Sequence, residues 1–419
     1  MYIPDYAKTV LDRLNGAGYE AYAVGGSVRD SLLGVPVNDW DVTTSALPEE
    51  TEQVFRGFRV IETGIRHGTV TVVSEGHNIE ITTYRCDGAY ADNRHPENVV
   101  FVRDIKEDLL RRDFTVNAMA YSPRDGLRDV SGGMKDLEDR VIRAVGDAHT
   151  RFSEDGLRVM RAVRFASQLC FTIESATRDA VLADRHLLKN ISSERLFSEL
   201  KKTLAGRGVT ETLKEYGTVI STFIPELVPL TEKDTALWEQ TCRAAGTVKN
   251  DTILRLAVLF SSVGKDAAAE ALARLKADRK TAETVTLLVG LADAELPRSK
   301  PQTRRMIHGV GEENLVRLLD LRRAMSAAAG DTDSGDTERI SAWISEIAAD
   351  GDCVSLKSLA VGGKDVLSLG VRPEDVGTLL NAALYAVMDE RLPNRKNELM
   401  TYIKNLVSEE MPHEKDNPA

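Results

Sequence analysis

The chain has 419 residues, of which 42% are hydrophobic, and a formal net charge of -11. This length is too great for one hydrophobic core and predicts roughly two to four folded domains. The negative charge excludes indiscriminate binding to nucleic acid, which depends on an excess of Lys and Arg, although a local basic cleft is still compatible with it.

The sequence indicates neither secretion nor a membrane partner. It contains no run of about 18 apolar residues that would span a bilayer. The segment MYIPDYAKTVLDRL carries charges where a signal peptide needs an apolar core. The four cysteines lack C-x-x-C spacing, so neither a disulfide framework nor a zinc site is expected. We therefore expect a cytoplasmic protein.

The first third of the chain alternates helix and strand patterns. Helices are predicted at 6–14 and 27–33, and strands at 20–24, 39–43, 58–64, 68–74 and 78–85. These elements predict a small mixed sheet flanked by helices. The segment CDGAYADNRHPEN at 86–98 has the composition of a mobile loop that is able to close over a site.

The remainder of the chain has a helical pattern. From about Arg151 to Asn405, Leu, Ala, Glu, Lys and Arg recur at helical spacing and strand signals nearly vanish. Breaks are expected near Gly206, around Pro301 and across the polar segment 327–338. The fold class expected from these patterns is α+β, with a small mixed sheet followed by helical domains.

Two aspartates flank a tryptophan in the segment DWDVTT at 39–44. In a strand, Asp39 and Asp41 would share one face, while Trp40 would point the opposite way into the core. Two carboxylates suit Mg²⁺, which usually takes one or two of them plus substrate phosphates. By itself, D-x-D is more typical of a solvent-facing strand edge than of a metal site, so its neighbours decide the interpretation.

The residues before this segment favour a phosphate pocket. Gly25 and Gly26 lie between a strand and a helix, where backbone N–H groups can approach a phosphate without a Cβ in the way. Arg29 adds a charged fork. A Gly pair also occurs in plain turns, but here it precedes R-D and D-x-D, and this order predicts a site for a triphosphate and a metal.

Two further acids are candidates for a third catalytic carboxylate. Glu80 projects opposite its apolar neighbours in a different strand, where it is either a metal-site ligand or a solvated residue. Asp113, next to Arg112, either serves the site or caps a helix over 114–119. The sequence leaves the choice between Glu80 and Asp113 open.

The segment SEDGLRVMRAVRFASQLC predicts a helix with Ser153 as its N-cap. At 100° per residue, Arg158, Arg161 and Arg164 lie together opposite an apolar face. A surface helix with a solvated arginine face would have the same pattern. Asp155 is unusual in this pattern, because it projects near the apolar side at the helix start.

Hydrogen-bonding chemistry suggests a role for Asp155 with Arg158. A carboxylate only accepts and a guanidinium only donates, so the two can read an amino donor beside a ring-nitrogen acceptor, as in cytosine and adenine. Uracil and guanine present the reverse order and would leave buried groups unpaired, at roughly 1 to 3 kcal/mol each. The alternative is a helix surface pair worth ~0.2 to 0.5 kcal/mol.

The chain resembles the class II tRNA nucleotidyltransferases, the CCA-adding enzymes. Segments that look like successive family motifs keep the family's order, and they are dense from about Ala21 to Leu204: GGSVRDSLLG, DWDVTT, ETGIRHGTVTVV, IEITTYR, DGAYADNRHP, DLLRRDFTVNAMAY, EDGLRVMRAVRFASQL and ISSERLFSEL. The segments VGGKDVLSLGVRPEDVG and LPNRKNELMTYI resemble the tail of bacterial members more loosely.

The resemblance implies an architecture and a reaction. It implies a nucleotidyltransferase head at 1–147, a neck at 148–205, a helical body at 206–300 and a tRNA-binding tail at 301–419. The 3′-hydroxyl of tRNA would attack the α-phosphate of CTP or ATP, with release of pyrophosphate, and Mg²⁺ would assist. Gly26 and Arg29 would touch the nucleotide, and Asp39 and Asp41 would hold the metal. The remaining pocket residues implied are Arg112, Asp155, Arg158, Arg161 and Arg164.

Related activities leave different signatures. Bacterial poly(A) polymerases usually carry G-[RK]-[RK]-F where this chain has Gly64 followed by IRHGTVTV, which favours tRNA as the substrate. CC-adding relatives lack part of the loop DGAYADNRHP, which favours full CCA addition. No His is followed by Asp, so no appended phosphohydrolase domain is expected. A non-catalytic RNA-binding protein is the alternative from another class, and the sequence leaves open whether the protein is a monomer or a homodimer.

Overall fold

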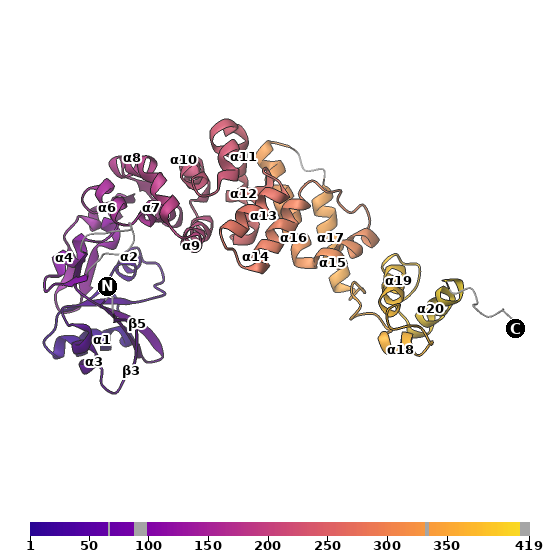
Figure 1. Ribbon diagram of the computed structural model, residues 1–419, viewed down its shortest axis with the longest axis horizontal. Coiled ribbons are helices and arrows are strands. Elements are labelled where there is room, and N and C mark those ends of the chain that lie inside the picture. The colour runs from indigo at the N-terminus through magenta and orange to yellow at the C-terminus, as the bar shows by residue number, and fades with distance from the viewer. Residues whose placement is uncertain (66–67, 88–98, 332–334, 411–419) are drawn as a thin grey trace, which may run out of the picture. The chain divides into compact units, whose positions relative to one another are not determined.

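The computed structural model describes residues 1–65, 68–87, 99–331 and 335–410 (Figure 1). The chain divides into two compact units. Unit 1 comprises residues 1–242 and 270–278, and unit 2 comprises residues 243–269 and 279–419. Within the described residues, no helix is long and apolar enough to cross a membrane. Residues 88–98 of the predicted mobile loop lie outside the described residues.

A seven-stranded mixed sheet forms the centre of the N-terminal part, as the alternating pattern predicts. Its strand order is β3-β4-β5-β2-β1-β8-β9, and β2 and β5 pair in parallel, whereas the other neighbours are antiparallel. The strands are β1 (Ala21–Val24), β2 (Asp41–Thr44), β3 (Arg59–Gly64), β4 (Thr69–Ser74), β5 (His77–Thr83), β8 (Met119–Ser122) and β9 (Gly126–Asp129).

The period-2 alternation gives this sheet two buried layers. On one side, helices α1 (Asp5–Gly16) and α3 (Pro48–Val54) contact β4. On the other side, Tyr22 and Val24 pack in a cluster with Tyr84 and Leu109. Trp40, just before β2, is only 4% exposed, which confirms the prediction that it packs into the core.

The rest of unit 1 is almost entirely helical. Its α-helices up to residue 221 are α2 (Gly26–Leu32), α4 (Ile105–Leu110), α5 (Gly133–Glu138), α6 (Ala148–Glu154), α7 (Leu157–Leu169), α8 (Ser175–Ala183), α9 (Ser193–Leu204) and α10 (Val209–Ser221). The other elements are η2 (Thr115–Asn117), η3 (Asp184–Asn190), η4 (Pro225–Leu227), η5 (Pro229–Lys233), β6 (Arg85–Asp87), β7 (Val99–Phe101), β10 (Val141–Ile142) and β11 (Thr172–Ile173). Helix α11 (Thr235–Thr247) leads out of this unit.

Unit 2 is helical throughout its described residues. Its helices are α12 (Thr252–Ser261), α14 (Arg279–Gly290), α15 (Lys300–Val310), α16 (Glu312–Ala329), α17 (Asp336–Ala349), α18 (Gly363–Leu367), α19 (Val376–Met388) and α20 (Lys396–Glu410). Helix α13 (Lys265–Arg274) is shared between the two units. A separate apolar cluster that includes Val366, Leu384 and Ile403 holds the last three helices together. The expected α+β class is therefore confirmed.

Three local predictions were wrong. Ser153 is not an N-cap, because the chain forms α6, capped by Asp147, and then α7, which begins after Gly156. No α-helix follows Asp113; the short η2 leads into strand β8, where pairing with β1 overrides helix propensity. The strand expected to include Asp39 begins at Asp41.

Candidate active site

The carboxylates of Asp41 and Glu80 lie on one face of the sheet. Strands β2 and β5 pair in parallel with Asp41 opposite Glu80, and the neighbouring residues Val42 and Ile81 are buried on the opposite face. Asp39, two residues before Asp41, is exposed just outside the strand. The structure therefore brings Asp41 and Glu80 together from different strands, with Asp39 close to them in the chain.

The pKa of Asp41 is raised, first by burial of its carboxyl and then by the nearby negative charges. Asp41 keeps contact with solvent, yet the surrounding protein raises its pKa to about 6, and the Glu80 and Asp39 carboxylates add to the shift. Arg112 acts in the opposite direction. Carboxylates that repel one another at an open surface are suited to a divalent cation, because its charge removes the repulsion.

Two carboxylates, such as those of Asp39 and Asp41, are the usual protein contribution to a Mg²⁺ site. The described residues contain no cluster of three or more Asp, Glu, His or Cys with metal-binding geometry. Mg²⁺ does not require one, since it usually keeps waters and substrate phosphates beside one or two carboxylates. The crowding at Asp41 therefore makes the site compatible with a metal that is completed by the substrate.

The two glycines stand at the start of α2, where the predicted phosphate pocket begins. Gly25 is the N-cap residue with φ 76°, a conformation that favours glycine, and a Cβ there would meet Nη1 of Arg112 at 3.3 Å. Gly26 is the first residue of the helix. Arg29, one turn later, is buried and donates to Oδ1 of Asn117 at 2.6 Å. Asn117 thus orients a guanidinium beside the helix start.

A buried carboxylate, Asp108, holds the arginines next to the site. Its side chain is fully buried, and it accepts hydrogen bonds from Arg111 at 2.7 Å, Arg112 at 3.2 Å and the Thr43 hydroxyl at 3.2 Å. Burial opposes ionisation, but the Arg112 and Arg111 guanidiniums outweigh it and hold the pKa of Asp108 below its ordinary value. Asp108 therefore connects Arg112 to strand β2.

Asp113 forms an ion pair with Arg161 and does not join the carboxylates on the sheet. Its Oδ2 accepts from Nε of Arg161 at 2.7 Å, and its Oδ1 accepts from the backbone N–H of Phe114 at 2.8 Å. Burial opposes ionisation, yet Arg161, with help from Arg158 and the Phe114 N–H, lowers the pKa of Asp113 to about 2. This carboxylate joins η2 to α7.

The pairing of Asp113 predicts an acid-dependent loss of stability. Its folded pKa lies below the ordinary value of 3.8, so the ion pair stabilises fully above about pH 4, and this contribution, about 2 kcal/mol, is lost as the pH falls from 4 to 2. In urea unfolding, Asp113→Asn should lower the free energy of unfolding near pH 7 and flatten its pH dependence below 4. Asp12→Asn, which breaks an exposed pair with Lys8, is the control. Parallel pH curves for Asp113→Asn and the unmodified protein would contradict the assignment.

Helix α7 directs two of its arginines, Arg158 and Arg164, into protein instead of solvent. Arg158 and Arg164 are each 8% exposed, so the alternative of a solvated arginine face was wrong. Arg164 forms an ion pair with Glu199 of α9, while burial and the nearby Arg161 lower its pKa to about 10. The guanidiniums of Arg29, Arg161 and Arg164 surround the ring of Phe165 at 5.2, 5.4 and 4.0 Å from its centroid.

Asp155 and Arg158, the predicted base-reading pair, have separate partners. Asp155 lies between α6 and α7, where it accepts from the Leu157 N–H at 3.0 Å and from Arg195 of α9 at 3.3 Å. Arg158 donates to Glu154 and to the backbone carbonyl of Arg111. Both side chains are therefore oriented before any nucleotide arrives.

Several residues of the site were missed from sequence. These are the partners that orient the predicted residues: Asp108, Asn117, Glu154, Arg195 and Glu199. One signal was available, because Asp108 precedes Arg111 and Arg112 at helical spacing. Glu154 lies four residues before its partner Arg158, which is also a helical spacing. The remaining partners are distant in sequence, up to the 88 residues that separate Asn117 from Arg29.

Sequence profiles of three domain families match successive parts of the chain. The Poly A polymerase head domain matches residues 21–143, the probable RNA and SrmB-binding site of polymerase A matches 170–227, and the putative tRNA nucleotidyltransferase domain 2 matches 249–403. The first profile covers the strands and turns that hold Asp39, Asp41 and Glu80. The three matches keep the order of head and following helical domains.

Curated relatives match almost the whole chain. A CCA-adding enzyme from Levilactobacillus brevis is 36% identical over 403 residues, which are 95% of this chain and 97% of the relative. One from Geobacillus kaustophilus is 35% identical over 429 residues, which are 98% of each chain. This chain belongs to the bacterial CCA-adding enzyme family. Members of the family are nucleotidyltransferases that add CCA to the 3′ end of tRNA.

A solved structure of the CCA-adding enzyme family has the same fold. The Bacillus stearothermophilus CCA-adding enzyme in complex with CTP is 31% identical, and the match covers 98% of this chain and 100% of that one, with a TM-score of 0.79. Family membership and the head fold predicted from the motifs are thus confirmed, whereas the roles of individual site residues remain predictions.

Proposed function

We propose that the chain completes and repairs the 3′-terminal CCA of tRNA from CTP and ATP, in the cytoplasm, without a nucleic-acid template. The observation that carries this proposal is the pair Asp41 and Glu80 on adjacent strands, opposed by Arg112, in a chain related to CCA-adding enzymes over nearly its full length. A scaffold protein has no need for carboxylates that repel one another.

In the proposed reaction, the tRNA 3′-hydroxyl attacks the nucleotide α-phosphate and pyrophosphate leaves. Asp39 and Asp41 would hold Mg²⁺, which when bound activates the hydroxyl and neutralises the leaving oxygens. We assign the third carboxylate to Glu80, because Asp113 is paired with Arg161. With the metal ligands on the sheet, the rest of the protein mostly positions the substrates.

We propose that the triphosphate lies between the start of α2 and the arginines beside it. The Gly25 N–H already donates to the Met119 carbonyl at 3.2 Å, so the backbone N–H of Gly26 would donate to a phosphate oxygen, with Arg29 and Arg112 supplying positive charge. Arg161 and Arg164 would extend this charge along α7. The partners Asn117 and Asp108 fix two of these guanidiniums in advance, which lowers the cost of ordering them on binding.

Base selection is assigned to Asp155 and Arg158. Asp155 accepts two hydrogen bonds from protein, and a carboxylate has capacity for about four, so it can accept another from the amino group of cytosine or adenine. Arg158 would donate to the adjacent ring nitrogen. Arg195 and Glu154, which hold these side chains, would fix the spacing between donor and acceptor.

One experiment tests the activity directly. The purified chain is given tRNA transcripts that lack all three, the last two or the last one of the terminal nucleotides, with CTP and ATP, and the products are sequenced. Each transcript is expected to end in CCA. A stop after CC would identify a CC-adding enzyme, a homopolymeric A tail a poly(A) polymerase, and absence of Mg²⁺-dependent pyrophosphate release a non-catalytic protein.

The base-reading role predicts a change in selectivity. Arg158→Ala should reduce the preference for CTP over UTP by about 10-fold or more. In the unmodified protein, UTP would leave the Arg158 guanidinium unpaired at a cost of roughly 1 to 3 kcal/mol, and the substitution removes this penalty. Competition between CTP and UTP at one tRNA end measures the ratio of kcat/KM values. Arg178→Ala, at an exposed site on α8, is the control. An unchanged ratio in Arg158→Ala would refute the role.

A further inference from the structure

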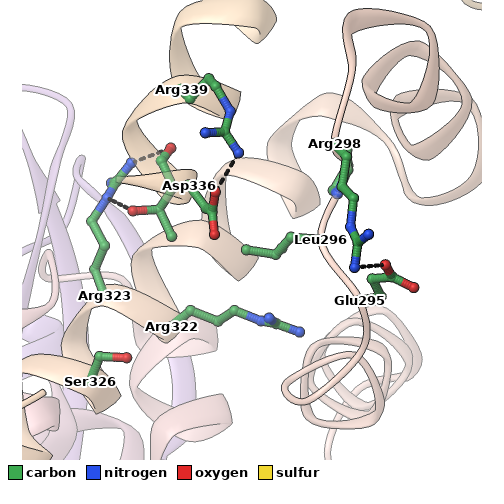
Figure 2. A pocket seen from close by; sticks show the side chains of 10 residues that line it. Glu295, Leu296, Arg298, Arg322, Arg323, Ser326, Asp336 and Arg339 are labelled. Atoms are coloured by element: carbon green, nitrogen blue, oxygen red, sulfur yellow. Dashed lines mark hydrogen bonds and ion pairs between the residues drawn. The ribbon is translucent and has the colours of Figure 1, made fainter. Parts of the chain in front are cut away.

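Unit 2 contains a pocket rich in arginine, at a distance in sequence from every catalytic candidate. Its volume is about 620 Å³, and it is formed by α16, α17 and the segment before α15 (Figure 2). Its charged lining residues are Glu295, Arg298, Arg322, Arg323, Asp336 and Arg339. Four guanidiniums thus face two carboxylates, so the lining has an excess of positive charge in a chain whose net charge is -11.

Three of these arginines already have carboxylate partners. Arg298 pairs with Glu295 at 2.6 Å and Arg339 pairs with Asp336. Arg323 pairs with Asp320 at 3.0 Å, and it also donates to the Thr337 hydroxyl at 3.0 Å. These pairs neutralise much of the lining and hold it in place; Figure 2 shows the contacts of Arg298 with Glu295 and of Arg339 with Asp336.

Arg322 differs from the other three. Its Nη2 donates to the backbone carbonyls of Leu291, at 3.0 Å, and Ala294, but no carboxylate of the described residues lies within ion-pair distance of it. Its Nε is buried without an acceptor. In Figure 2 the side chain extends from α16 into the pocket, toward the segment that carries Arg298.

A partly buried guanidinium without a carboxylate partner costs free energy of folding. Burial lowers the pKa of Arg322, and Asp293 opposes this only in part, yet a guanidinium stays protonated near neutral pH. A partly buried charge with neutral carbonyl partners is stabilised strongly when an anion approaches, because desolvation has already weakened its interaction with water. The two carbonyl contacts also fix the plane of the guanidinium, so an anion would meet an oriented donor.

We propose that this pocket binds a phosphate group, with Arg322 as its principal ligand. Phosphate fits better than a further carboxylate, because a tetrahedral oxyanion offers oxygens to several donors at once, and Arg298 and Arg339 line the same pocket. The group is either free inorganic phosphate or pyrophosphate, or a phosphodiester of bound RNA. The inference is independent of the chemistry proposed for Asp39 and Asp41.

A signal at Arg322 itself tests the proposal. In the full-length protein labelled with ¹⁵N, the Nε–H resonance of Arg322 is identified by its absence in Arg322→Lys. It is then followed during titration with inorganic phosphate, with pyrophosphate and with tRNA, against sodium chloride of equal ionic strength. A shift with the free anions identifies them as the source, and a shift with tRNA alone identifies a phosphodiester. No shift with any of the three overturns the proposal.

A matched pair of variants tests the same point without removing Arg322. Ser326→Glu places a carboxylate in the pocket wall one helical turn after Arg322, where it competes with phosphate. Ala327→Glu makes the same charge change at an exposed neighbouring position. For whichever ligand moves the Arg322 signal, we expect affinity to fall at least 10-fold in Ser326→Glu and less than 2-fold in Ala327→Glu. Equal affinities in the two folded variants would overturn the proposal.

Discussion

Replacement of Asp39 or Asp41 by Ala is expected to reduce nucleotide incorporation by about 10³-fold or more and to leave tRNA binding nearly intact. The two carboxylates are the proposed ligands of Mg²⁺, and loss of several kcal/mol of charge stabilisation in the transition state corresponds to at least this factor. tRNA binding should persist, because removal of a negative charge does not weaken the attraction of a polyanion. Single-turnover incorporation of CTP and filter binding of tRNA measure the two effects separately.

The control for these variants is Glu75→Gln, which removes one negative charge at the exposed hairpin turn between β4 and β5. It should retain full activity. Glu80→Gln tests the third carboxylate, and we expect a loss that exceeds that of Asp113→Asn when both variants are folded. Near-normal turnover in both Asp39→Ala and Asp41→Ala would refute the metal-binding role.

The second large effect is expected at Asp108, and it is an effect on stability. Asp108→Asn leaves Arg111 and Arg112 without their buried counter-charge, and loss of one partner of a buried ion pair costs about 3–5 kcal/mol. Because Asp108 also accepts from Thr43 of β2, the change should loosen the strand that begins at Asp41. Urea unfolding at pH 7 measures the free energy of unfolding, and CTP incorporation measures the effect on the site.

Asp139→Asn is the matched control for Asp108. Asp139 forms an ion pair with Lys135 in which its side chain is 48% exposed, so its removal should cost less than about 1 kcal/mol. A similarly small change for Asp108→Asn would contradict the interpretation of Asp108 as an anchor for the two arginines.

The sequence was sufficient to predict five of the seven strands of the sheet and the helical character of the chain beyond Arg151, but not strands β8 and β9. Alternation in β4 and β5, and the helical period beyond Arg151, depend on neighbours that are close in the chain, and such patterns are readable without coordinates. The break between α6 and α7 was not readable in this way. There, Asp155 has extended dihedral angles and ends α6, and the adjacent Gly156 lies against Leu187 of η3, a contact between segments that are distant in sequence.

The candidate site shows the same division. Asp39, Asp41, Gly26 and Arg29 were predicted from local order, because a strand, a turn and a helix start follow one another directly. The choice between Glu80 and Asp113 depended on which strand pairs with β2 and which arginine reaches Asp113. Those facts are set by pairing across 39 and 48 residues, and no local pattern encodes them.

The parallel pairing of β2 with β5 makes the position of the carboxylates a property of the whole sheet. Strand β2 is hydrogen-bonded on both sides, to β1 and to β5, so a slip by one residue would turn Asp41 toward the apolar layer and bring Val42 to the surface. Deletion of one residue within 41–44 would therefore inactivate the protein, because it shifts the register of β2 against its neighbours. Insertions at the 75–76 hairpin turn, which lie outside that pairing, should be tolerated. The chain should therefore tolerate changes of length at this turn but not within the strand that begins at Asp41.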